Sequence, residues 1–176
     1  MSEINLLSSL SNDQQIEILR KNWMSHDARW QYVTFQELGI EKGNKLNQDV
    51  SHQMGKVITY RLLNALGISQ VNTIKEMQTI FHTIMELCYP APRFIYHFEQ
   101  KSDSSLLAVM EYCTIYENVK KAGIADQYEC ACSAMHLGWC EAMKIDAEEK
   151  ITRSLKKGDD FCEFIFKVNK FNITED

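Results

Sequence analysis

Proline and glycine are scarce in this chain, with two and seven residues among 176. The scarcity excludes collagen-like and proline-rich sequence, and no repeat or low-complexity linker separates independent domains. Apolar runs are short as well: none reaches the roughly 20 residues that a membrane span needs. The segment from Met1 to Leu10 lacks the basic start and the apolar run of a signal peptide. We therefore expect a cytoplasmic protein with no membrane partner.

Positive charge is also in short supply, since 19 basic residues against 24 acidic ones give a formal net charge of -5. Binding to phosphate backbones requires a basic stripe, so we predict no nucleic-acid partner. The pairs Lys120-Lys121 and Lys156-Lys157 are typical of solvated turns. The chain also lacks a serine elbow, a phosphate-binding glycine loop and a dinucleotide fingerprint, which argues against acyl-serine, kinase-type and nicotinamide chemistry.

Hydrophobic periodicity predicts helices first and strands later. Apolar residues recur at three- and four-residue steps as far as Leu87 and alternate after Pro92. The expected helices span residues 12–38, 41–66, 73–87 and 125–143, and the expected strands span residues 93–100, 105–115, 150–155 and 161–168. We predict an α+β fold, in which an N-terminal helical bundle is packed on a four-stranded antiparallel sheet with a crossing helix. Residues 1–89 are the helical subdomain and residues 90–176 the α+β ligand-binding subdomain of one compact unit.

Local signals refine these elements. Asn12 is the expected N-cap of the first helix, and Gly39 is its expected end. Gly55 lies inside the second helix and indicates close packing against another helix. In the last strand we expect Cys162, Phe164 and Phe166 to point together into the covered face of the sheet.

A polar pair interrupts the apolar stripe of the first helix, because His26 and Asp27 lie between Trp23 and Trp30. Buried polar groups need partners, so we predict that His26 is buried and bonded to a group outside its own helix. One interpretation is that the pair caps a neighbouring helix or bonds to Asn44 or Asn47. In the other interpretation, His26 and Asp27 are catalytic, with His26 as a base or metal ligand, and Trp23 or Trp30 clamps a ligand or cofactor.

The second interpretation needs partners from the sheet half. The candidates are Cys113, Cys130, Cys132 and Glu117. We predict Glu117 as a third catalytic residue, with a carboxylate at a helix start as the alternative. Metal ligands would be His26 with the three cysteines, and zinc and iron are the metals considered.

The chain contains six cysteines, and a cytoplasmic setting predicts that no disulfide joins them. Cys130 and Cys132 diverge by about 200° on a helix, so one can face a site while the other packs. Cys132, His136 and Cys140 recur at four-residue steps, but the outer pair lie about 12 Å apart along a helix. We therefore reject a three-ligand metal site on that face. The alternative is that both cysteines belong to the core and that His136 lies at its edge.

Four segments resemble a known family. They are residues 26–30 (HDARW), 116–123 (YENVKKAG), 128–132 (YECAC) and 157–162 (KGDDFC). Together they resemble an uncharacterised family of anaerobic bacteria and archaea that is similar to L-2-amino-thiazoline-4-carboxylic acid hydrolase-like proteins. More distantly, the last third is similar to the vinyl-4-reductase-type ligand-binding domain.

The first resemblance implies a cytosolic protein that binds a small molecule, as a metal- or thiol-dependent hydrolase that opens a thiazoline ring. A non-catalytic ligand or metal sensor is the alternative, as is an assembly partner in an anaerobic pathway, and a homo-oligomer is considered. The second resemblance implies a zinc site of three cysteines and a glutamate. Cys162 matches the last cysteine, and Cys130 or Cys132 matches the first, but Ser154 and Ile151 stand at the remaining positions.

Overall fold

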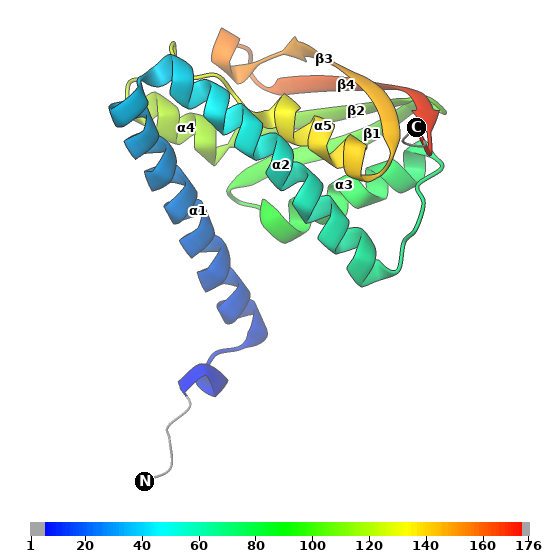
Figure 1. The fold of residues 1–176 in the computed structure, drawn as a ribbon, viewed down its shortest axis with the longest axis horizontal. Coiled ribbons are helices and arrows are strands. Elements are labelled where there is room, and N and C mark those ends of the chain that lie inside the picture. The colour runs from blue at the N-terminus through cyan, green and yellow to red at the C-terminus, as the bar shows by residue number, and fades with distance from the viewer. Residues whose placement is uncertain (1–5, 174–176) are drawn as a thin grey trace. The chain divides into compact units, whose positions relative to one another are not determined.

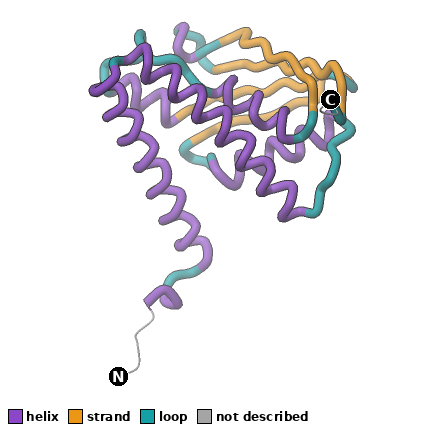
Figure 2. The backbone as a smooth tube through the Cα atoms, viewed as in Figure 1, coloured by secondary structure: helices purple, strands orange, loops and turns teal. Residues whose placement is uncertain are grey.

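The computed structural model describes residues 6–173. The chain divides into two compact units, Met1–Gly43 and Asn44–Asp176. The predicted change from helices to strands near Pro90 falls inside the second unit. Figure 2 shows this change as the passage from purple helices to the orange strands.

The first unit consists of a 3-10 turn (Leu6–Ser9), helix α1 (Asn12–Leu38) and the start of α2. The N-cap of α1 is Ser11 rather than Asn12. The Ser11 hydroxyl accepts from the Gln14 backbone N–H at 3.2 Å, and the Gln14 side chain accepts from the Ser11 N–H at 2.8 Å. Asn12 is the first residue inside the helix, since this reciprocal capping box satisfies two N–H groups at once. The helix ends at Gly39 as predicted, with a φ of +80° that side chains rarely adopt.

The second unit holds the remaining elements, which Figure 1 labels. The helices are α2 (Ile40–Leu66, which starts in the first unit), α3 (Ile74–Cys88), α4 (Thr114–Lys121) and α5 (Cys132–Ala142). The strands are β1 (Phe94–Ser102), β2 (Ser105–Cys113), β3 (Ile145–Arg153) and β4 (Cys162–Phe171), with a 3-10 turn at Leu155–Lys157. The sheet is antiparallel in the order β1-β2-β4-β3. The predicted α+β fold with a four-stranded antiparallel sheet is confirmed.

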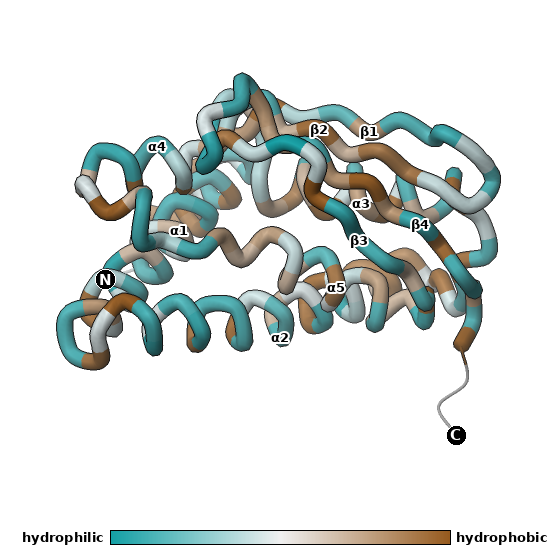
Figure 3. The backbone as a smooth tube through the Cα atoms, turned by 90° about the horizontal axis from the view of Figure 1, so that it is seen from above, coloured by the Kyte–Doolittle hydropathy of each residue, from teal (hydrophilic) through white to brown (hydrophobic). Residues whose placement is uncertain are grey.

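The core of the second unit lies between the sheet and helices α3 and α5. Both helices lie on one face of the sheet (Figures 1 and 3), with α3 against β1 and β2 and α5 against β3. The central strands β2 and β4 carry much of the hydrophobic colour in Figure 3. The Phe81 ring of α3 packs edge to face against the rings of Trp139 on α5 and Phe166 on β4. The distances between the ring centroids are 4.9 and 5.2 Å. Burying an aromatic side chain of this size stabilises a fold by about 1.5–3 kcal/mol or more.

The register of β4 is as predicted. Phe164 and Phe166 are buried in the core, and Cys162 lies on the same face of the strand. The prediction for Gly55 is also confirmed. A Cβ at Gly55 would collide with the Met135 carbonyl of α5, and a Cβ at Gly138 would collide with the His52 carbonyl of α2. These two glycines let the backbones of α2 and α5 pack in direct contact.

Helix α4 (Thr114–Lys121) was not expected, and it begins within the strand predicted over residues 105–115. Two other elements start at a different residue. The third strand begins at Ile145 instead of residue 150, and the fifth helix begins at Cys132 instead of residue 125. Acidic residues hide the start of the strand, because Glu148 and Glu149 break the expected apolar alternation. A hydrogen-bonded turn around Ile124 precedes the helix, with Tyr128 N–H donating to the Ile124 carbonyl at 2.9 Å.

Candidate functional site

Four thiols from four segments of the second unit form a cluster, which we call the thiol cluster. Its members are Cys113 at the end of β2, Cys130 in the loop before α5, Cys132 at the start of α5 and Cys162 at the start of β4. Burial raises the pKa of the Cys113 thiol to about 11, and the charges of Cys130 and Cys162 act in the same direction. The thiols are therefore close enough to affect one another's ionisation.

Cys130 and Cys132 are the closest pair of the thiol cluster. Their sulfurs lie 3.1 Å apart and share a hydrogen bond. When Cys130 ionises, the Cys132 thiol donates to it, which lowers the pKa of Cys130 to about 7 and raises that of Cys132. The Cys132 backbone N–H also donates to the Cys130 sulfur, and the charge of His136 favours the thiolate. The residue Cys130 is exposed, and burial of its sulfur opposes the lowering of its pKa.

A buried histidine–carboxylate pair accompanies the thiols. His136 lies one turn after Cys132 on α5, and its Nδ1–H donates to Glu149 Oε1 of β3 at 2.6 Å. The two side chains are only 13% and 4% exposed. This bond fixes the proton on Nδ1 and leaves Nε2 as the nitrogen that can accept a further proton. The rings of Trp139 and Phe164 hold the imidazole at centroid distances of 4.8 and 5.0 Å.

The second carboxylate oxygen of Glu149 is buried without a hydrogen-bond donor among the described residues. A buried charged group without a partner costs on the order of 1–3 kcal/mol or more, so this oxygen destabilises the folded state. It is an acceptor that a bound molecule can use. The charge of Glu149 also acts on Cys130, whose pKa it raises against the larger lowering by Cys132.

Sequence reasoning missed Glu149 and gave His136 only an edge role. The expected strand started at residue 150, which left Glu149 outside the sheet. The signal was the alternation of Ile145, Ala147 and Glu149, which places the carboxylate on the inward face of β3.

Asn44 of α2 holds the loop that carries Cys130. Its side chain is 4% exposed, donates to the Gln127 carbonyl at 2.7 Å and accepts from the Glu129 N–H at 3.1 Å. The sequence interpretation considered Asn44 as a partner of the His26–Asp27 pair. The amide N–H and the amide oxygen of Asn44 instead bond to the backbone immediately before Cys130.

The prediction that His26 is buried is wrong. His26 and Asp27 are exposed, and α1 has no buried residue. The first unit has a single long helix, which is too little chain to cover the apolar stripe. The His26 ring lies 6.4 Å from Trp30 of its own helix, and Trp30 is 68% exposed, whereas Trp23 is half-buried. These residues belong to the first unit, and their catalytic and ligand-binding roles stay predictions.

Glu117 lies in the first turn of α4, where a carboxylate stabilises the helix dipole. Among residues 6–173 its side chain pairs with Lys120, at 3.3 Å. This placement favours the alternative of a helix-start carboxylate. Of the four predicted metal ligands, Cys130 and Cys132 are in contact, and Cys113 acts electrostatically on Cys132 and is itself affected by Cys130.

Metal binding by these residues stays a prediction. Within residues 6–173 no three histidine, cysteine or acidic side chains converge closely enough to hold a metal ion. All six cysteines are free thiols in the structure. Their reduced state in the native protein stays a prediction for thiol titration.

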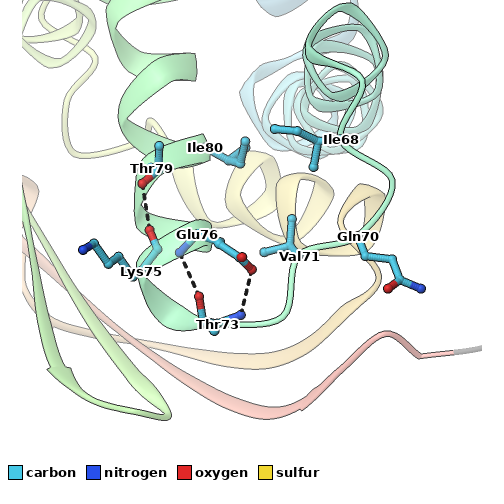
Figure 4. A pocket seen from close by; sticks show the side chains of 8 residues that line it. All are labelled: Ile68, Gln70, Val71, Thr73, Lys75, Glu76, Thr79 and Ile80. Carbon is cyan, nitrogen blue, oxygen red and sulfur yellow. Dashed lines mark hydrogen bonds between the residues drawn. The ribbon is translucent and has the colours of Figure 1, made fainter.

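Two surface hollows lie away from the thiols. The first, of about 480 Å³, lies beside the start of α3 (Figure 4). Its polar side chains Thr73 and Glu76 bond to the start of the helix as a capping box. The second, of about 550 Å³, lies over β1, β2 and the start of β4, where His97 pairs with Glu111 at 3.2 Å. Neither hollow contains a cysteine.

Comparison with known proteins agrees with the motifs. The sequence profile of the L-2-amino-thiazoline-4-carboxylic acid hydrolase family matches residues 20–166. The chain belongs to this family. The match to the L-2-amino-thiazoline-4-carboxylic acid hydrolase family includes all four members of the thiol cluster, His136 and Glu149. The resemblance to the vinyl-4-reductase-type domain stays a prediction.

No curated protein matches the chain at a significant level. Among solved structures, the fold is similar to that of trafficking protein particle complex subunit 3 from Naegleria fowleri, solved covalently bound to palmitic acid. The TM-score is 0.51 and the sequence identity 12%, over 89% of this chain and 96% of that chain. At this identity the likeness concerns the fold alone. Within residues 6–173 no helix is long and apolar enough to span a membrane.

Proposed function

We propose that this protein is a cytoplasmic, thiol-dependent hydrolase that opens a small ring containing a C=N bond, of the 2-amino-thiazoline kind. Membership of the family supports this class of substrate. The observation that carries the proposal is the buried His136–Glu149 pair, whose charges act on the Cys130 thiol. A nucleophile, a base and a group that orients the base are the parts that thiol-dependent hydrolysis requires.

Each residue has a defined role in the proposed reaction. The Cys130 thiolate adds to the carbon of the C=N group, and the nitrogen takes a proton from His136. The ring carbon–sulfur bond then breaks, because a thiolate is a better leaving group than an amine anion, and the carbon stays on Cys130 as a cationic isothiourea. Water attacks this carbon, His136 accepts one water proton, the ring thiolate takes the other, and the Cys130 thiolate is released. The net reaction adds one water molecule across the ring bond.

Glu149 contributes twice to this mechanism. Its Oε1 orients the His136 ring and stabilises the imidazolium that forms when Nε2 takes up a proton. Its unpartnered Oε2 accepts an N–H of the substrate, such as that of an amino group on the ring. A ligand that supplies this donor removes the cost of the buried, unpaired oxygen.

The test is hydrolysis of L-2-amino-thiazoline-4-carboxylic acid by the full chain, followed as loss of the ring. The wild-type protein should catalyse the reaction, and Cys130→Ser should abolish it. Cys140→Ser is the matched control, because Cys140 lies on α5, which follows the loop of Cys130, but is buried and has its pKa raised to about 12. Equal activity of the wild type and Cys130→Ser would refute the proposal.

The thiol cluster favours a second candidate function, the binding or sensing of a thiophilic metal ion. Cysteine thiolates are preferred ligands of zinc and iron, and the four thiols of the cluster act on one another's ionisation. Elemental analysis of protein purified without oxygen tests this function. About one equivalent of metal, lost in Cys113→Ser, would support it. Metal-free wild-type protein would refute it and leave the hydrolase proposal in place.

A further inference from the structure

The two sulfurs of Cys130 and Cys132 lie unusually close for free thiols. Their separation is 3.1 Å. A disulfide bond measures about 2.05 Å, so the sulfurs need to approach by only about 1 Å to bond. One residue, Ala131, separates the two cysteines and serves as the N-cap of α5 without a side-chain hydrogen bond. The chain around this pair is therefore a loop end and not the interior of a helix.

The thiols of Cys130 and Cys132 differ in their exposure, as a pair in which one thiol meets the oxidant and the other forms the disulfide requires. Cys130 is exposed, whereas Cys132 is half-buried. Their sulfurs are in contact, so a Cys130 sulfur that has been oxidised has the Cys132 sulfur within reach. The more exposed thiol can thus meet an oxidant first, and its less exposed neighbour can react with the product.

Cys113, Cys140 and Cys162 are less suited than Cys130 to react with an oxidant. Cys113 and Cys140 are buried, and Cys162 is half-buried with its sulfur accepting from the Leu155 N–H at 3.3 Å. Restricted access slows the reaction of these thiols with oxidants.

We propose that Cys130 and Cys132 form a peroxide-reactive dithiol, in which Cys130 attacks a hydroperoxide and Cys132 resolves the product as a disulfide. In the first step the Cys130 sulfur attacks the terminal peroxide oxygen. The O–O bond breaks, the alcohol or water leaves with a proton, and Cys130 becomes a sulfenic acid. In the second step the Cys132 sulfur attacks the Cys130 sulfur, the S–O bond breaks and water leaves. The peroxide is reduced by two electrons, and the two thiols are oxidised to one disulfide.

This reaction goes beyond hydrolysis but shares its nucleophile. A disulfide at Cys130 removes the thiolate that the proposed hydrolysis needs, so peroxide would stop that activity until a thiol reductant restores the pair. Resolution by Cys132 also protects Cys130 from irreversible oxidation to a sulfinic acid.

Mass spectrometry of the oxidised full chain tests the proposal without any measurement of hydrolysis. Trypsin cleavage after Lys121 and Lys144 leaves residues 122–144 as one peptide with three cysteines. Cys140→Ser leaves only Cys130 and Cys132 in that peptide, so this variant serves as the reference protein. After reduction without oxygen, one equivalent of hydrogen peroxide is added, and free thiols are then blocked with N-ethylmaleimide.

The expected product is a peptide that has lost two hydrogen atoms and carries no blocking group. With Cys132→Ser added, the reaction should stop at a sulfenic acid on Cys130 that dimedone traps. With Cys130→Ser added, the peptide should remain reduced and be blocked at Cys132. A reference peptide that keeps both thiols, or a disulfide from Cys130 to a different cysteine, would overturn the proposal. Failure of hydrolysis in every variant would bear on the proposed function alone.

Discussion

Replacement of Asn44 by alanine tests how the loop before α5 sets the chemistry of Cys130. The Asn44 amide makes two hydrogen bonds to that loop, at 2.7 and 3.1 Å. Each contributes about 0.5–1.5 kcal/mol net. Gln127 and Glu129 are exposed, so water can replace the lost partners. We therefore expect Asn44→Ala to lower the free energy of unfolding by about 1–3 kcal/mol, and not by the larger cost of buried unpaired groups.

The same change should alter the reactivity of Cys130. A loosened loop moves the Cys130 sulfur away from the Cys132 groups that hold its pKa at about 7. The pKa should rise towards the ordinary thiol value of about 8.5. At pH 7 the thiolate fraction would then fall from about one half to a few per cent, and the alkylation rate would fall up to about tenfold.

Two assays measure these effects. Urea denaturation gives the free energy of unfolding, and the rate of iodoacetamide labelling at Cys130 against pH gives its pKa. Asn47→Ala is the matched control, since Asn47 lies one turn further along α2 and its side chain makes no hydrogen bond within residues 6–173. A labelling profile for Asn44→Ala that coincides with that of Asn47→Ala would refute the reasoning, even if stability falls.

Three further predictions concern the packing, the carboxylate and the pH dependence. Gly138→Ala should lower the free energy of unfolding by about 1–3 kcal/mol in urea, since its Cβ collides with α2; unchanged stability would contradict that contact. Glu149→Gln should lose hydrolysis while Glu148→Gln, exposed on the same strand, keeps it; equal rates would remove Glu149 from the mechanism. Labelling of Cys130 should rise with pH through about 7 because its pKa is lowered, and Cys140 should label only at far higher pH. Likewise, the stability from the lowered pKa of Cys130 is fully present above about pH 8.5 and is lost as pH falls through about 7; stability that rises as pH falls there would contradict it.

Periodicity was sufficient to predict the fold. The apolar residues at three- and four-residue spacing in α3 predict the buried face of that helix, and the apolar alternation in β4 predicts the buried face of that strand. The two faces pack together in the core, where Phe81 contacts Phe166. The same logic failed for His26. An apolar stripe predicts burial only where other residues of the fold cover that face of the helix. The sequence pattern of a helix does not indicate how many residues will pack against it.

The site was harder to predict because it depends on contacts between distant segments. Cys130 and Cys132 were candidates by residue type, but their 3.1 Å separation depends on a loop that ends just before α5. The alternation of Ile145, Ala147 and Glu149 indicates that Glu149 lies on the inward face of β3, but it does not indicate a site, since acidic residues on an outer strand are also typical of solvated positions. The role of Glu149 follows only from its hydrogen bond to His136, which lies thirteen residues earlier in the chain.

The covalent intermediate on Cys130 tests the central claim most directly. Wild-type protein is mixed with L-2-amino-thiazoline-4-carboxylic acid, quenched during turnover with acid and digested, and the peptide of residues 122–144 is weighed. We predict a substrate-derived adduct on Cys130 that is absent from Cys130→Ser and unaffected by Cys140→Ser. Hydrolysis that proceeds with no adduct on Cys130, or with an adduct on another cysteine, would contradict the role assigned to the Cys130, His136 and Glu149 site.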